Sequence, residues 1–398
     1  MRPRRVWIVL GVAVAFAAAG SASAVGVGSS NTPKTSTTST TRAPTPPTVS
    51  PTTFALPTAT RLPVQHNSSI QFSGASDGWL VVDPGNGGPG AVESSVDQGA
   101  QWQSSLSTPD NLWGLQFVNQ QDGWVVGSSS IDSTTDGGAT WSVRSEPSSP
   151  LAMVDFTTPE AGWGVTRANS LVATTNGGTT WSNVSTPVPV EGACFSSNGT
   201  FGWFIGEDVI YSTSTGGRTW SLAYRSPQPS SAPLANEISC SGTDAWAQFV
   251  LGAGLGQSSE LEVSTTAGAA ANGWKVVGAS GPGTTHFSQL GISGTFSTPV
   301  VGSHGKALLL SLCSNCGAAS PQQQRVLGLQ SPNIGSSLVR LTELTLANVV
   351  SAPVAALSTG AAWMCVRTHN GTNYSDLIFQ VLPGSSTWHQ EASIPIAP

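Results

Sequence analysis

The sequence predicts an all-β fold, a seven-bladed β-propeller whose blades are four-stranded antiparallel sheets. The composition supports this, because the 398 residues include 45 Gly and 27 Pro and only 9% are charged. Many short strands joined by Gly-rich turns give such a composition, whereas helices would need more Leu, Glu and Lys. A tight-turn motif and a pattern of tryptophans both recur with a period of about 40 residues, as in propeller blades. Six or eight blades are the alternatives.

An eight-residue turn, here called the box, marks the repeat most clearly. It runs from Ser or Thr through a Gly-rich turn to Trp. Its four closest copies are Ser95–Trp102, Thr134–Trp141, Thr174–Trp181 and Thr213–Trp220. The glycine three residues before each Trp can adopt the positive φ that a tight hairpin turn needs. These glycines are Gly99, Gly138, Gly178 and Gly217.

Two further box positions have a structural interpretation. An Asp or Asn five residues before the Trp can accept hydrogen bonds from N–H groups of the turn. This position holds Asp97, Asp136 and Asn176, with Thr215 in the fourth copy. The terminal Trp is expected to pack on the face of a blade and to bury on the order of 150–250 Å². These residues are Trp102, Trp141, Trp181 and Trp220. We therefore interpret the boxes as structural elements rather than as ligand sites.

Tryptophans mark a second position in each repeat, in a Gly-Trp strand that precedes the box. Aligned by repeat, the strand positions are 79, 124, 163, 203, 246, 306 and 363, and the box positions are 102, 141, 181, 220, 274, 338 and 388. Twelve of the 14 Trp lie on these two tracks. The sixth repeat differs at both positions, with Lys306 and Leu338 in place of Trp. Seven repeats of four short strands predict seven blades.

The chain divides into three parts. Residues 1–24 carry Arg2, Arg4 and Arg5, then an apolar run and an Ala-Ser-Ala site. This is the pattern of an export signal peptide, with an uncleaved signal-anchor as the alternative. Residues 25–65 are rich in Ser, Thr and Pro and are expected to form a disordered linker. Residues 66–398 hold the propeller repeats. We therefore expect a protein that is secreted or held at the cell surface, with membrane contact only through an uncleaved N-terminal segment.

Five cysteines fit an exported protein, in which disulfides can form. Cys194 and Cys240 occupy the inner strands of neighbouring repeats, and a bond between them would join two blades. Cys313 and Cys316 form a C-x-x-C motif, which we interpret as a local disulfide, with redox or metal chemistry as the alternative. Cys365 is then the unpaired cysteine.

Charge and residue spacing argue against several kinds of partner. The formal net charge is −6, and the few Lys and Arg are not clustered, so no nucleic-acid partner is expected. The five histidines are scattered without the spacing of metal ligands, and neither a metal nor another cofactor is expected. We expect a monomer.

The box pattern, Ser/Thr-x-Asp/Asn-x-Gly-x-x-Trp, resembles the Asp-box or BNR repeat of bacterial sialidases and sortilin-type receptors. The preceding Gly-Trp strand makes the chain most similar to exported BNR-like propellers grouped with the photosystem II stability and assembly factor. The resemblance covers about residues 67–398, with four close boxes and three degraded ones. It implies a propeller whose boxes lie at the periphery, away from the face where ligands usually bind. It says little about function, because one fold carries many activities.

The catalytic residues of sialidases are not apparent in this sequence. The resemblance would require an Arg-Ile-Pro motif, which does not occur, and Arg218 falls within a box, on the face away from ligands. Other glycoside hydrolases need two carboxylates at a fixed separation. The adjacent Glu207 and Asp208 are interpreted as a solvated turn. No catalytic residue is assigned, and a glycoside hydrolase is kept as the alternative function.

The favoured function is an exported, non-enzymatic scaffold that binds a protein or a cell-envelope glycan. The ligand would meet the loops between second and third strands and the connections between blades. Trp113 lies off both tryptophan tracks, in such a connection, and could serve as an aromatic platform, with ordinary strand packing as the alternative. The other candidate residues are Arg367, His369 and Tyr374 in one loop, and Glu207 and Asp208 in another. Further irregular loops are Asp83–Gly90, Leu251–Glu260 and Cys313–Arg325.

Overall fold

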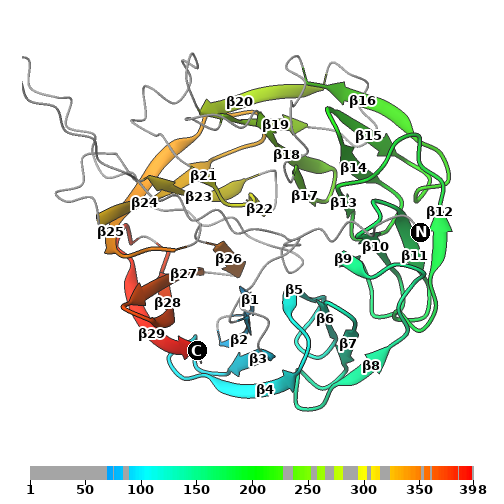
Figure 1. The fold of residues 1–398 in the computed structure, drawn as a ribbon. Helices are drawn as coiled ribbons and strands as arrows, with labels where there is room; N and C mark the ends of the chain where they lie inside the picture. The colour runs from blue at the N-terminus through cyan, green and yellow to red at the C-terminus, as the bar shows by residue number, and fades with distance from the viewer. Residues whose placement is uncertain are drawn as a thin grey trace, which may run out of the picture. The chain divides into compact units, whose positions relative to one another are not determined.

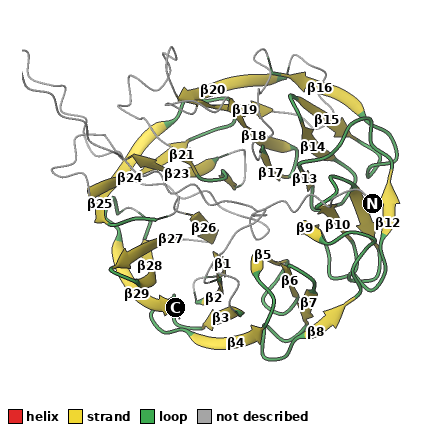
Figure 2. Ribbon diagram, viewed as in Figure 1, coloured by secondary structure: helices red, strands yellow, loops and turns green. Residues whose placement is uncertain are grey.

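The computed structural model describes the propeller repeats with gaps. The described residues are 70–74, 76–83, 89–226, 236–251, 258–264, 273–280, 295–302, 306–313, 323–350, 354–358, 361–383 and 385–396. The predicted leader, the linker and the Cys313–Cys316 disulfide lie outside them, as do most of the three irregular loops after Asp83, Leu251 and Cys313. The described part of the chain consists of strands and loops (Figure 2), and none of it forms a helix long and apolar enough to cross a membrane.

The first four repeats form four sheets of four strands. The first contains β1 (Ile70–Ser73), β2 (Asp77–Val82), β3 (Gly90–Ser95) and β4 (Gln103–Thr108). The second contains β5 (Leu112–Phe117), β6 (Gly123–Gly127), β7 (Ile131–Thr134) and β8 (Ser142–Arg144). The third contains β9 (Leu151–Phe156), β10 (Gly162–Thr166), β11 (Leu171–Thr174) and β12 (Ser182–Val184). The fourth contains β13 (Gly192–Phe195), β14 (Gly202–Gly206), β15 (Val209–Thr213) and β16 (Ser221–Arg225).

The last three repeats form longer strands. The fifth sheet contains β17 (Glu237–Ser241), β18 (Asp244–Leu251), β19 (Ser258–Ser264) and β20 (Trp274–Ser280). The sixth contains β21 (Thr295–Phe296), β22 (Val300–Val301), β23 (Ala307–Cys313), β24 (Gln323–Ser331) and β25 (Val339–Ala347). The seventh contains β26 (Val354–Ser358), β27 (Ala361–Asn370), β28 (Asn373–Val381) and β29 (His389–Ile396).

All strand pairs are antiparallel, and each sheet runs from a first strand near the centre of the ring to a last strand at its perimeter (Figure 1). Six sheets are the four-stranded blades that the sequence predicts, and the sheet of the sixth repeat departs from the pattern with five strands. Its inner strand is broken into β21 and β22, which both pair with β23. The break contains Pro299, which has no N–H to donate to a ladder. Ser297 restores one contact, because its Oγ accepts from Leu310 N at 2.9 Å.

The ring closes by packing, without exchange of strands between its ends. The first sheet is built from residues 70–108 and the last from residues 354–396. Phe72 of β1 stacks on Trp363 of β27 with ring centroids 3.8 Å apart and planes 5° apart. The indole Nε1 of Trp363 also donates to the carbonyl of Gln98, in the first box, at 3.0 Å.

The same aromatic group recurs between neighbouring sheets. Phe156 of β9 stacks on Trp124 of the preceding sheet at 3.6 Å and meets Trp181 of its own box edge-on at 6.0 Å. A Cβ on Gly162 would come within 2.5 Å of this ring, which explains why Gly precedes Trp in the repeat. Equivalent groups surround Phe72, Phe117 and Phe195. Each boundary between sheets therefore has its own hydrophobic core.

The second-strand position of the sixth repeat was wrongly predicted as Lys306. Ala307 pairs with Ser331, the first residue of the sixth box, as the Gly before Trp pairs with the first box residue in other sheets. Leu308 therefore occupies the Trp position, and it is buried in one cluster with residues of the seventh sheet. The sixth repeat lacks the Gly-Trp pair, so the register of this strand could not be placed from the local sequence.

The boxes hold their turns through hydrogen bonds to the hydroxyl of the first box residue and to the side-chain oxygen of the third, which is a carboxylate in the first two boxes. In the second box, Thr134 Oγ1 accepts from Gly138 N at 2.9 Å, and Asp136 Oδ1 accepts from Thr140 N at 2.8 Å. Hydrogen bonds from the Thr140 hydroxyl, the Thr140 N–H and the Thr134 hydroxyl lower the pKa of Asp136 to about 2. The four box glycines have φ between 82° and 92°. Both observations support the structural interpretation of the box.

Polar side chains tie the first inner strands to one another. Gln71 Nε2 donates to Phe117 O at 2.8 Å, and its Oε1 accepts from Phe117 N at 2.7 Å. Gln116 makes the same two bonds with Phe156, at 3.1 Å and 2.6 Å. Each amide thus satisfies the open edge of the next inner strand, where unpaired backbone groups would otherwise remain.

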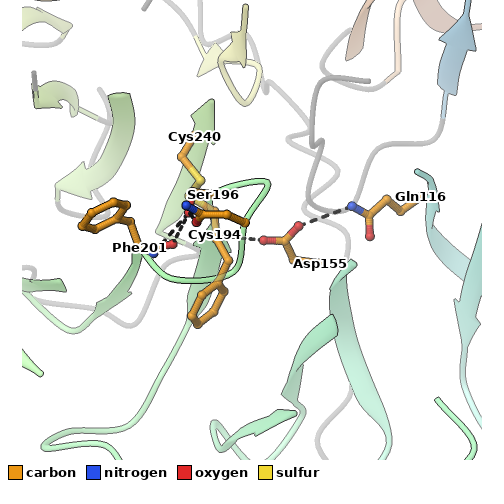
Figure 3. Close-up of a disulfide and its surroundings, with 8 residues drawn as sticks. Gln116, Asp155, Cys194, Ser196, Phe201 and Cys240 are labelled. Atoms are coloured by element: carbon orange, nitrogen blue, oxygen red, sulfur yellow. Dashed lines mark hydrogen bonds between the residues drawn. A yellow bond between two sulfur atoms is a disulfide. The ribbon is translucent and has the colours of Figure 1, made fainter. Parts of the chain in front are cut away.

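The next two boundaries use a carboxylate and a disulfide (Figure 3). Asp155 Oδ2 accepts from Phe195 N at 2.6 Å, and Asp155 Oδ1 accepts from Gln116 Nε2 at 3.3 Å. In the following sheet Cys194 forms the expected disulfide with Cys240, with Cα atoms 6.0 Å apart. Cys240 stands where the first four inner strands carry Phe. The disulfide therefore joins a boundary that lacks the aromatic stack.

We expect Phe156→Ala to lower the free energy of unfolding by about 3–5 kcal/mol, because it removes the ring between two tryptophans. Val143→Ala, at a side chain of β8 that is 73% exposed, is the control and should change it by less than about 0.5 kcal/mol. Urea unfolding followed by tryptophan fluorescence measures both. Equal effects of the two substitutions would contradict the role of the aromatic group.

The double variant Cys194→Ser/Cys240→Ser should be less stable than the wild type by about 2–4 kcal/mol, because the bond closes a long loop across a sheet boundary. A thiol reductant should lower the stability of the wild type towards that of the double variant and leave the double variant unchanged. Cys365→Ala, at the free buried cysteine, should keep the sensitivity to reductant. If the double variant still responds to reductant, another bond is responsible.

Candidate functional site

The order of strands gives the ring two faces. The turns between second and third strands and the connections that leave the fourth strands lie at one end of each sheet, here called the mouth face. The boxes and the turns between first and second strands lie at the other end, here called the box face. The candidate residues outside the boxes all belong to the mouth face.

Arg367, His369 and Tyr374 lie in a long hairpin, not in a loop as the sequence suggested. β27 continues to Asn370 and β28 begins at Asn373, so only two residues form the turn. His369 and Tyr374 are opposite each other in the register, with ring centroids 6.1 Å apart. The segment just before β26 extends the sheet, because Val349 forms a β-bridge with Thr368. This pairing is long-range, and the local sequence carries no signal for it.

Arg367 fixes the base of the hairpin. Its Nε and Nη2 donate to the two oxygens of Asp376 at 2.8 Å and 2.9 Å, and its Nη1 donates to the carbonyl of Asp83, in the first sheet, at 2.6 Å. Asp376 is buried. A two-point contact of this kind sets both distance and orientation. Arg367 is therefore a support for the hairpin and a link across the ring closure rather than a free surface cation.

Apolar and aromatic surface is exposed on the outer part of this hairpin. Tyr374 is 42% exposed and Val350 is 44% exposed. Val350 N donates to the carbonyl of Arg367 at 2.9 Å, and His369 N donates to Asn348 O at 3.1 Å. Val350, His369 and Tyr374 are here called the hairpin patch.

Trp113 lies within strand β5, not in a connection between blades. The register of β5 against β6 shifts between Leu112 and Gly114, so Trp113 is the extra residue of a β-bulge. Bulges re-aim a side chain out of the strand alternation. The ring packs on the core between the second and third sheets, and the guanidinium carbon of Arg167 lies 4.0 Å from the ring centroid. Part of the indole surface of Trp113 thus packs against the core, and the guanidinium group of Arg167 lies over its ring.

Trp113 has counterparts in the next three sheets. Counting back four residues from the inner-strand Phe, or from Cys240, gives Trp113, Ala152, Glu191 and Asn236. These mouth positions hold an aromatic, a small, an acidic and an amide side chain at equivalent places. The type of side chain at this position of the mouth face therefore varies from sheet to sheet, whereas the aromatic residues of the core below it recur.

Glu191 and Asn236 bridge the fourth and fifth sheets. Asn236 Nδ2 donates to Glu191 Oε2 at 2.7 Å and to the carbonyl of Glu207 at 2.7 Å, and Glu207 N donates to Glu191 Oε1 at 3.2 Å. Burial raises the pKa of Glu191. Glu207 and Asp208 form the two-residue turn between β14 and β15, with Glu207 at φ 52°. Glu207 joins the network through its backbone.

Glu237, at the start of β17, is a further acidic residue that the sequence analysis missed. Its carboxylate accepts a hydrogen bond from Thr298 Oγ1, in the break between β21 and β22. Burial raises the pKa of Glu237 to about 7. An acid with such a pKa exchanges protons near neutral pH, as a catalytic acid or a pH-sensitive contact would.

The candidate residues form separate groups rather than one site. The hairpin patch belongs to the seventh sheet, Trp113 to the second, and Glu207 and Asp208 to the fourth. Within the described ranges, no three His, Cys, Asp or Glu side chains lie together as metal ligands would. Aligning the repeats on the inner Phe could have found Glu191 and Asn236. Arg167 could not be found, because its partner lies in another sheet.

Comparison with known proteins supports the fold. Residues 94–186, which include three boxes, match the family described as photosynthesis system II assembly factor YCF48. No curated protein sequence matches the chain significantly. Among solved structures, the GH74 enzyme of Niastella koreensis is 12% identical with a TM-score of 0.50, covering 85% of this chain and 67% of the enzyme.

Two structures of YCF48 are also similar. YCF48 bound to a D1 peptide is 13% identical with a TM-score of 0.49, covering 78% of this chain and 96% of that protein. YCF48 from Cyanidioschyzon merolae is 13% identical with a TM-score of 0.46 and the same coverage. At these identities the likeness is one of fold.

The raised pKa of Glu237 predicts a loss of stability with rising pH. The folded state holds the proton more tightly than the unfolded chain, whose glutamate titrates near 4.5, so this stability is complete below that pH and is lost as the pH rises through about 7. Glu237→Gln keeps an acceptor for Thr298 and cannot ionise. At about pH 8 the variant should be more stable than the wild type by on the order of 2–3 kcal/mol, and the difference should vanish near pH 4. Thermal melting across this range measures it, and parallel curves would contradict the assignment.

Proposed function

From the premise that the chain is a BNR-type β-propeller similar to the photosystem II assembly factor, we propose that it is an exported, non-enzymatic scaffold that binds a protein partner at its mouth face. The pattern of an export signal, cleaved or kept as an anchor, that the sequence predicts in residues 1–24 is the basis for the exported location. A protein is favoured over a glycan because the matching family is described as an assembly factor, and assembly is an action on proteins.

The observation that carries this proposal is the hairpin patch. Tyr374 on the hairpin and Val350 on the segment beside it expose apolar surface, and aromatic anchors contribute much of the energy of protein interfaces. Arg367 holds the base of the hairpin through Asp376 and the Asp83 carbonyl. A surface that is already rigid loses little conformational entropy on binding. The hairpin patch is therefore a pre-organised docking surface for a protein segment.

A glycoside hydrolase is the second candidate function, and Glu237 is the observation that favours it. Its pKa of about 7 suits a general acid. Such an enzyme also needs a second carboxylate about 5–10 Å away. Glu191, another half-buried acid of the mouth face, instead uses both carboxylate oxygens in hydrogen bonds to Asn236 and Glu207. This arrangement favours a scaffold over a hydrolase.

Crosslinking and capture of the tagged full-length chain from its own cells tests the proposal. We expect His369→Ala/Tyr374→Ala to reduce the yield of the crosslinked partner about 10-fold or more, measured by quantitative mass spectrometry. Leu222→Ala is the matched control, since Leu222 lies in β16 and is 42% exposed, and it should leave the yield unchanged.

Two results would overturn the proposal. One is an equal yield of the same partners from the hairpin variant and the control, which would show that the hairpin patch is not the docking surface. The other is hydrolysis of a glycan by the purified wild type that is lost in Glu237→Gln, which would establish the enzyme.

A further inference from the structure

The fourth box differs from its three siblings in charge. Its Thr215 stands where the others hold Asp97, Asp136 and Asn176, and its Arg218 stands where the others hold Ala100, Ala139 and Thr179. Together the two positions carry a negative charge in the first two boxes, no charge in the third and a positive charge in the fourth. The Asp or Asn of the sibling boxes is a hydrogen-bond acceptor for the turn, and in the fourth box the Thr215 hydroxyl accepts the equivalent bond from Thr219 N at 2.9 Å. The turn therefore forms with Thr215 as well as with Asp or Asn, so the requirements of the turn do not explain why the fourth box differs in charge.

The neighbouring turn of the box face shows the same trend. Each box lies against the turn between the first and second strands of its own sheet, and these turns carry Asp77, Asp122 and Glu160 in the first three sheets. In the fourth sheet this turn contains no acid, and Thr200 O accepts from Gly216 N at 2.8 Å. Among the first four sheets, the fourth is thus the one whose paired turns lack a carboxylate and carry a cation.

The two turns of the fourth sheet enclose a hollow of about 370 Å³, lined by Gly199, Thr200, Ser214, Thr215, Gly216 and Arg218. Arg218 is held beside it, because its Nε donates to Thr215 O at 3.1 Å, and the residue is exposed. Within the described chain, the hydroxyls of Thr200 and Ser214 form no hydrogen bond to another protein group. The hollow therefore offers hydroxyl and guanidinium donors from two turns, with no carboxylate among its lining residues.

A third difference concerns the tryptophan beneath the fourth box. In three other boundaries the indole N–H donates to a box carbonyl: Trp79 to Gly137, Trp124 to Gly177 and Trp363 to Gln98. Trp163, beneath the fourth box, is buried, and its Nε1 has no hydrogen-bond partner among the residues that the structure describes. The fourth box thus lacks the hydrogen bond from an indole N–H that the first three boxes accept.

We propose that this hollow, here called the box-four hollow, binds a tetrahedral oxyanion, either phosphate or sulfate, free or as an ester. Guanidinium groups and hydroxyls are the side chains that recognise such anions, and a guanidinium pre-oriented by one hydrogen bond loses less freedom on binding. The carboxylates of the sibling boxes would repel the same ligand. The site lies on the box face, so it is independent of the hairpin patch.

The test uses the purified full-length chain at low ionic strength, because an exposed charge pair is screened by salt. Isothermal titration with inorganic phosphate and with inorganic sulfate should show one site. Thr215→Asp restores the side chain of the first two boxes, which shows that the turn accommodates it, and should weaken binding about 10-fold or more. Arg218→Ala should do the same, whereas Arg225→Ala, in β16, removes a cation away from the hollow and should change little.

Ester probes separate the two sources of the anion. Tighter binding of galactose 6-sulfate or glucose 6-phosphate than of the inorganic ions would identify an ester as the ligand, and binding of the inorganic ions alone would identify a free ion. The proposal is overturned if the wild type binds none of these probes, if Thr215→Asp and Arg218→Ala bind them as the wild type does, or if Arg225→Ala loses as much affinity as Arg218→Ala. Melting temperatures of the variants show that each is folded.

Discussion

The phenylalanine held between two tryptophans is the contact on which the ring depends. One tryptophan comes from the preceding sheet and the other from the box of the same sheet, so each phenylalanine joins three strands of two blades. A flat stack and an edge contact also suit the charge distribution of aromatic rings. Because the contact is made between blades, no blade can bury its own core alone. The blades are therefore stable only as a ring, and the stack of Phe72 on Trp363 that closes it has the same geometry as the others.

Where the aromatic contact is missing, other chemistry takes its place. At the boundary of the fourth and fifth sheets a disulfide occupies the position of the phenylalanine, and Asn236 adds a hydrogen-bonded bridge at the mouth. In the sixth sheet, Leu308 replaces tryptophan and the inner strand is broken at Pro299. A repeat fold of this kind tolerates such changes because each blade contacts mainly its neighbours. Positions at which the repeat pattern is broken are also those whose side chains are not required for contacts between blades.

The box face and the mouth face differ in how regularly their residues repeat from sheet to sheet. On the box face, the first and third residues of each of the first four boxes accept hydrogen bonds within the turn, and the box-four hollow differs from the other boxes in charge. On the mouth face, equivalent positions carry Trp113, Glu191 and Asn236, and a long hairpin rises from the seventh sheet. The supports of the hairpin are the half-buried Arg367 and the buried Asp376, an ion pair with two hydrogen bonds that sets a fixed orientation.

The sequence by itself determined the repeat, the strand order and the box turns, because Gly, Asp and Trp act locally or at fixed spacing. It also indicated the pairing of Cys194 with Cys240, since the repeat places both on inner strands. Only the tertiary structure decided the rest. The register of the sixth repeat, the bulge that re-aims Trp113 and the extension of the β27–β28 hairpin depend on contacts with other sheets or distant segments. Such contacts leave no period in the sequence, because each occurs once, whereas the contact of a phenylalanine with two tryptophans recurs at a fixed spacing in the first four repeats.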